Sequence, residues 1–220
     1  MSYKGLTGRT RRTYLQIKQG SLFLKSTDKD NEHYAEKSVE FGGETYVNAG
    51  LWFSKLTDKI TRVSLYDGSF GLQINIDTEE GYTISTAYDK RYGVSLMERL
   101  PNIDTEKEVT IAPYSFEDEK GRIVQGVNLY QDGEKIESRY NKDNSEKFGF
   151  PQSPIDAGKK KITSADWKAF FMLRNNKLKD LLDEWIEKKY PDTGTEVAVN
   201  EQIQKATDVV DDINVDDIPF

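Results

Sequence analysis

Aromatic and cationic side chains alternate with apolar residues in several short segments of this 220-residue chain. In RTYLQIK (12–18), Leu15 and Ile17 alternate with polar, aromatic and charged residues, as they would in a strand with one buried face. Exposed rings stack on unpaired bases, and arginine or lysine between them contacts phosphates. We therefore predict a face that binds single-stranded nucleic acid. Its predicted contact residues are Arg9, Arg11, Arg12, Tyr14, Lys18, Tyr46, Trp52, Arg62, Tyr66, Arg122 and Tyr130.

The alternative interpretation is that these rings form a second core. A long helix near the C-terminal end, or additional hairpins, would then cover them. We favour the binding face, because tyrosine and charge alternate within the same predicted strands.

Other kinds of chemistry find little support in the sequence. There is no G-x-x-x-x-G-K-[ST] loop, no G-x-G-x-x-G and no H-E-x-x-H. The chain has no cysteine, and its single histidine, His33, leaves little scope for acid–base work or a histidine metal site. We predict neither enzyme activity nor a cofactor or metal.

Most of residues 12–140 has the pattern of short strands separated by glycine turns. TYVNAGLWF, FGLQINI and GRIVQGVNLY each alternate apolar and polar residues, which is typical of antiparallel strands with one buried face. One short helix is expected at 92–100, before Pro101. Strands on both sides of a single short helix favour a mainly β fold with some α, an OB-fold-like antiparallel Greek-key barrel.

The rest of the chain divides by composition. We predict that residues 1–145 are the OB-fold-like nucleic-acid-binding domain and that 146–162 are a linker or surface loop. Residues 163–190 have the pattern of a long amphipathic helix that starts at Thr163 or Ser164 and stops before Pro191. Residues 191–220 are predicted to be a disordered acidic tail, since eight acids with few large apolar groups cannot offset the entropy of ordering.

Charge is distributed unevenly along the chain. The net charge is −7, from 31 basic and 38 acidic residues. Eight acids and only Lys205 follow Pro191, so residues 1–190 carry 30 charges of each sign. The first 25 residues hold six bases and no acid. A basic end with an acidic tail is the pattern of a nucleic-acid-binding protein.

The chain ends in DDINVDDIPF, where aspartates surround a few apolar residues. Its last five residues, Asp216, Asp217, Ile218, Pro219 and Phe220, resemble the acidic tip of bacterial single-stranded DNA-binding proteins, which ends in Asp-Asp-Ile-Pro-Phe. The resemblance covers the tail only, because the body has no sequence match to the bacterial domain and carries an additional helix.

This resemblance implies a bacteriophage single-stranded DNA-binding protein with a host-type tip. Its expected partners are single-stranded DNA and, through the tip, replication and repair proteins, in the cytoplasm of a bacterial host. No membrane segment is expected, because no run of 18 apolar residues occurs. Two alternatives remain, a decoy that occupies host proteins through the tip without binding DNA, and a strand-annealing recombination protein.

Overall fold

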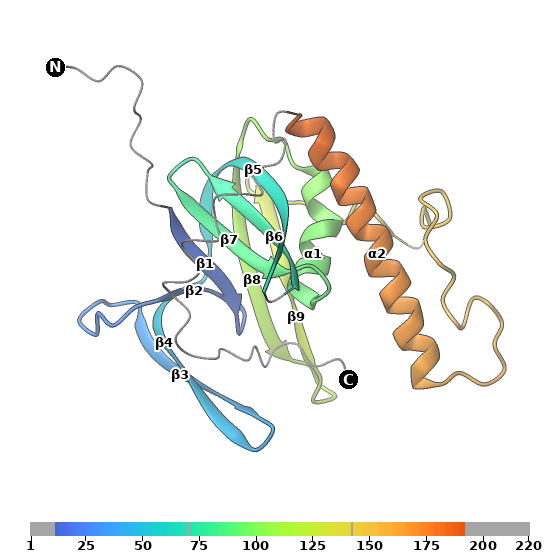
Figure 1. Ribbon diagram of the computed structural model, residues 1–220, viewed down its shortest axis with the longest axis horizontal. Helices are drawn as coiled ribbons and strands as arrows, with labels where there is room; N and C mark the ends of the chain where they lie inside the picture. The colour runs from blue at the N-terminus through green and yellow to red at the C-terminus, as the bar shows by residue number, and fades with distance from the viewer. Residues whose placement is uncertain (1–11, 70, 142, 192–220) are drawn as a thin grey trace.

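The protein is mainly β, with two α-helices in the described residues. A computed structural model describes residues 12–69, 71–141 and 143–191 (Figure 1). The strands are β1 (Thr13–Lys18), β2 (Ser21–Lys25), β3 (Tyr34–Phe41), β4 (Glu44–Phe53), β5 (Leu56–Gly68), β6 (Gly71–Thr78), β7 (Tyr82–Ala87), β8 (Glu108–Glu117), β9 (Ile123–Gln131) and β10 (Glu134–Lys135). The helices are α1 (Arg91–Arg99), the short 3₁₀ helix η1 (Leu100–Asn102) and α2 (Ser164–Lys189).

The strands form one sheet in the order β10-β9-β8-β5-β6-β7-β1-β2-β4-β3. No ladder in the described residues joins the two edge strands, β3 and β10, so the sheet is open. The sheet is also mixed. All neighbours are antiparallel except β1 and β7, which run parallel from Thr13 opposite Tyr82 to Gln16 opposite Ser85. The prediction of a purely antiparallel arrangement is wrong for this pair. A period of two identifies the buried face of a strand but not the direction of its neighbour.

The β1–β2 turn lies against β8, although no ladder in the described residues joins β8 to β1 or β2. Gln19 and Gly20 have positive φ angles, of 47° and 73°. The Gly20 amide donates a hydrogen bond to the Tyr92 hydroxyl oxygen at 2.8 Å, which ties the turn to α1. A Cβ at position 20 would overlap the backbone of Ser115 in β8, so this close approach requires glycine.

The core lies between one face of the sheet and the helices. Leu15, Ile17, Val63, Ile74 and Ile76 are buried on this face, as the alternation in the sequence predicts. Residues of α1 and η1 cover them, and the most deeply buried are Leu96, Met97 and Leu100. The predicted short helix is therefore confirmed, and it supplies the second layer of the core.

Part of the predicted linker also packs on this core. The ring of Tyr140 lies 4.9 Å from that of Phe148 and 5.4 Å from that of Phe150, measured between centroids. Residues 148–150 are thus attached to the body, and the exposed loop continues from there toward α2.

Helix α2 begins with the cap that the sequence predicts. The Thr163 side chain accepts a hydrogen bond from the Asp166 amide, and the Asp166 carboxylate accepts one from the Thr163 amide at 2.9 Å. This arrangement is a capping box. Hydrogen bonds from Lys159 and Thr163 lower the pKa of Asp166 to about 2.

Helix α2 contacts the body from Arg174 to its C-terminal end. Leu178, Leu182 and Ile186 are buried in the common core, whereas Phe171 and Leu173 are half exposed. The apolar side of the predicted amphipathic helix is therefore buried at one end only. In Figure 1, α2 lies beside α1, and its first turns extend away from the sheet.

Two leucines of α2 give a matched test of this packing. Leu178→Ala should lower the free energy of unfolding by roughly 2–5 kcal/mol, because the substitution leaves a cavity in the core. Leu173→Ala makes the same chemical change where the side chain is 53% exposed, and it should stay within about 0.5 kcal/mol of the parent. Urea unfolding of both variants checks the prediction, and equal losses would contradict it.

Candidate nucleic-acid interface

The face of the sheet opposite the core carries polar and aromatic residues in continuous cross-strand rows. Arg62 of β5 lies opposite Asp77 of β6, Asp77 opposite Thr83 of β7, and Thr83 opposite Tyr14 of β1. Directly paired residues point to the same side of a sheet. We call this surface the polar face; it consists of Tyr14, Gln16, Arg62, Ser64, Tyr66, Gln73, Asn75, Asp77, Thr83 and Ser85.

Asp77 organises the middle of the polar face. Its Oδ1 atom lies 3.0 Å from Nη1 of Arg12 and accepts a hydrogen bond of 2.6 Å from the Thr83 hydroxyl. The Arg12 side chain remains 39% exposed beside this carboxylate. The ion pair positions Arg12, a predicted phosphate contact, over the sheet. Asp77 also neutralises part of the charge of Arg12.

A second cation of the polar face is less accessible. Arg62 follows a β-bulge in β5, where the register with β6 shifts between residues 60 and 62. Its side chain is half-buried, and its Nε atom is buried with no hydrogen-bond partner in the described part of the chain. After the bulge, Arg62 lies opposite Asp77 in the ladder, since a bulge shifts the residues that follow it along the partner strand.

The two tyrosines of the polar face differ in exposure. Tyr14 is 55% exposed, so its ring is open to a stacking partner. Tyr66 is half-buried, and its ring lies over the backbone of Gly68. Of the predicted contact residues, the structure thus brings Arg12, Tyr14, Arg62 and Tyr66 onto one surface.

Trp52 and Lys18 are not open to solvent, which corrects two of the predicted contacts. Trp52 is 9% exposed, its ring centroid lies 4.7 Å from that of Phe23, and its indole N–H donates to the Ala35 carbonyl. Lys18 is 7% exposed and donates to Asn48 Oδ1 at 2.9 Å. Over β2, β3 and β4 the alternative of a second, smaller core is therefore the right description.

Lysine side chains complete this small aromatic cluster. Lys37 Nζ lies 4.0 Å from the Trp52 ring centroid, and Lys18 Nζ lies 5.0 Å from the Phe23 ring centroid. Burial lowers the pKa of Lys37. Cations over aromatic faces stabilise the cluster and cover rings that would otherwise be exposed.

Tyr46, Arg122 and Tyr130 do not belong to the cross-strand rows of the polar face. The Tyr46 hydroxyl donates to Glu44 in the β3–β4 hairpin, at 2.7 Å. Arg122 lies in the β8–β9 turn, where its Nη2 atom is 2.7 Å from Asp118 Oδ2. The predicted residues therefore do not form one continuous site.

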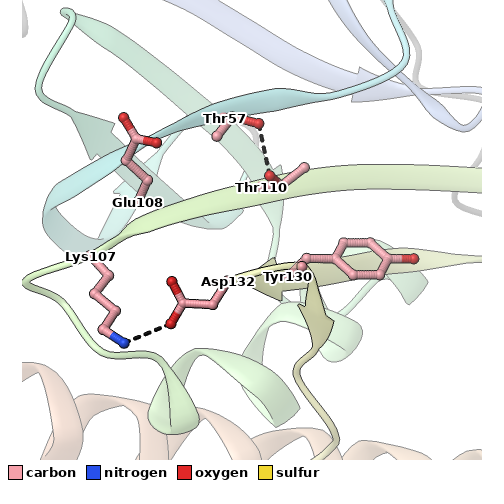
Figure 2. Close-up of a pocket in the computed structure, with 7 residues that line it drawn as sticks. Thr57, Lys107, Glu108, Thr110, Tyr130 and Asp132 are labelled. Atoms are coloured by element: carbon pink, nitrogen blue, oxygen red, sulfur yellow. Dashed lines mark hydrogen bonds and ion pairs between the residues drawn. The ribbon is translucent and has the colours of Figure 1, made fainter.

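Tyr130 lines a shallow pocket between β5, β8 and β9. The other lining residues are Thr57, Lys107, Glu108, Thr110, Asp132 and Gly133. Figure 2 shows the hydrogen bond between Thr57 and Thr110 and the ion pair between Lys107 and Asp132, at 2.7 and 2.6 Å. The hydrogen bond to Asp132 raises the pKa of Lys107. Lys107 and Asp132 of the pocket are thus already paired with each other, and Glu108 supplies a second carboxylate.

Arg9, Arg11 and the five tip residues lie outside the described residues. The exposed ring of Phe116 was not among the predicted contacts. Phe116 in β8 is 54% exposed, and its ring lies 5.9 Å from that of Tyr114, at an interplanar angle of 30°. The alternation in APYSFE could have revealed it, since Tyr114 and Phe116 are two residues apart.

Comparisons with known proteins identify no relative. No family model matches the chain, and neither curated proteins nor solved structures give a significant match.

In the described residues, no helix is long and apolar enough to cross a membrane. Across the same ranges, no three His, Cys, Asp or Glu side chains are grouped so that they could hold a metal ion.

Proposed function

We propose that this chain is a single-stranded DNA-binding protein that coats DNA during replication or recombination. The observation that carries this proposal is the row from Arg62 through Asp77 and Thr83 to Tyr14, with Arg12 beside it. It combines an exposed ring with cations on a polar sheet surface. Nucleic acid that is bound by stacking and by phosphate contacts needs this combination.

The connectivity of the strands supports an OB-type body. The sheet contains the meander β5-β6-β7, then α1, and then β8, which returns to pair with β5. Three strands, a helix and a returning strand follow the OB-fold order, in which the second and third strands bind oligonucleotides. In this chain those strands are β6 and β7, which supply five residues of the polar face.

Binding to single strands should depend on salt. The logarithm of the affinity for oligothymidylate should fall with the logarithm of the salt concentration, by about 0.7 for each phosphate neutralised. Duplex of equal length should compete poorly, because its bases are already stacked on each other. Fluorescence anisotropy at several salt concentrations measures both effects, and equal affinity for duplex would contradict the proposal.

Two equally exposed rings show which surface the DNA contacts. Tyr14→Ala should weaken oligothymidylate binding by roughly 1–3 kcal/mol without changing the salt dependence, because one stacking contact is lost. Phe116→Ala removes a ring of the same exposure outside the polar face, and binding should stay unchanged. If only the Phe116 variant binds more weakly, the DNA passes over β8 and the assignment to the polar face is wrong.

The tip forms the second part of the proposal, with replication and repair proteins of a bacterial host as its partners. Phe220 and Ile218 supply apolar groups, and Asp216 and Asp217 supply charge for a basic pocket. This part of the proposal rests on the resemblance of the last five residues to the tip of bacterial single-stranded DNA-binding proteins. It does not depend on DNA binding by the polar face.

Deleting Phe220 should abolish capture of these partners, because a small interface depends on its buried aromatic residue. Affinity for oligothymidylate should be unchanged. Pull-down with purified bacterial replication proteins measures the first effect, and anisotropy measures the second. Retained capture would contradict the role of the tip. A parent protein that captures partners but binds no DNA would instead be a decoy.

A further inference from the structure

The first half of α2 carries an exposed apolar surface, which we call the α2 patch. It consists of Trp167, Phe170, Phe171, Met172 and Leu173. Phe171, Met172 and Leu173 are 50%, 58% and 53% exposed. The Phe171 ring lies 5.8 Å from Trp167 and 5.2 Å from Phe170, so the three rings form one cluster.

This apolar character extends around the helix. Successive residues of an α-helix point about 100° apart, so the four consecutive residues 170–173 cover most of its circumference. A surface helix normally has a polar outer side. The contacts of α2 with the body begin at Arg174, which forms an ion pair with Glu98, and continue at Leu178, which is buried in the core. The α2 patch therefore lacks a partner within the described residues.

Basic residues surround the α2 patch. Residues 146–177 contain seven bases and three acids. Lys160, Lys161 and Lys168 are exposed, whereas Lys159 forms an ion pair with Asp166 at 2.6 Å. Two copies of this surface would repel each other if they met face to face. The charge therefore favours an occupant that is both acidic and apolar.

The chain itself contains such a segment. Residues 208–220, DVVDDINVDDIPF, hold five aspartates among seven apolar residues and no base. The end of α2, from which this segment is tethered, lies about 27 Å from Phe171 along the helix axis. A flexible chain of about 20 residues has a root-mean-square length near 25 Å, which matches this span.

We propose that residues 208–220 dock on the α2 patch of their own chain, with valine, isoleucine and phenylalanine side chains on the rings and aspartates beside the lysines. Tethering gives the segment a high effective concentration at the patch. A protein that binds the tip must then displace it from α2, so docking lowers the apparent affinity of the partner for the tip. Because this contact involves no DNA, it does not depend on the DNA-binding part of the proposed function.

A spin label tests the contact in the full-length chain. The natural sequence has no cysteine, so Asn214→Cys provides a single site for a nitroxide. In the ¹⁵N-labelled protein, the indole N–H signal of Trp167 should lose most of its intensity, and that of the buried Trp52 should keep it. Reduction of the nitroxide should restore the Trp167 signal, and raising the salt concentration should weaken the loss.

Matched variants locate the docking surface. Phe171→Asp should abolish the loss of the Trp167 signal. Val47→Asp makes a similar change on the β3–β4 hairpin, at a residue that is 56% exposed, and the loss should persist. An unaffected Trp167 signal in the parent, or an undiminished loss in Phe171→Asp, would overturn the proposal.

Two further outcomes would assign the patch to another occupant. If spin-labelled ¹⁴N protein broadens Trp167 of unlabelled ¹⁵N protein, the segment docks on a second copy of the chain. If the label has no effect but oligothymidylate shifts the Trp167 signal, the patch binds nucleic acid. Either result would overturn docking within one chain.

Discussion

The parallel pairing of β1 with β7 is the interaction on which the rest of the sheet depends. It joins the strands from β10 to β7 to those from β1 to β3, and no other ladder in the described residues connects these two groups. The same pairing brings Tyr14 beside Thr83 and Arg12 within reach of Asp77. Both the continuity of the sheet and the composition of the polar face therefore depend on four residue pairs.

The sequence predicted which side of each strand is buried, but it did not predict how the strands are arranged. Leu15, Val63 and Ile74 are in the core because burial follows the period of two, which is a local property. That Trp52 is covered by Phe23 and Lys37 depends on the neighbours of β4, which local periodicity does not specify. For the same reason, the sequence selected Tyr14 and Arg62 correctly for the outer side and could not separate them from Arg122 or Tyr130.

Helix α2 shows a similar division between local and long-range information. Its cap at Thr163 and its length were predictable, because they depend on residues close in sequence. Its sequence has apolar residues along its whole length, yet only those from Leu178 onward are buried in the core. Capping stabilises the start of the helix where packing does not, so the exposed first turns remain helical next to the basic loop.

The long separation in sequence between β1 and β7 has a consequence for how the chain folds. Thr13 pairs with Tyr82, whereas the hairpins β5–β6 and β6–β7 join neighbouring segments. Contacts between distant residues form more slowly, since a large loop must close before they stabilise the chain. During synthesis, β1 has no partner on its β7 side until residue 87 has emerged. Strand β1 is therefore made first but pairs with β7 late, and a nascent chain has a complete polar face only after β7 is in place.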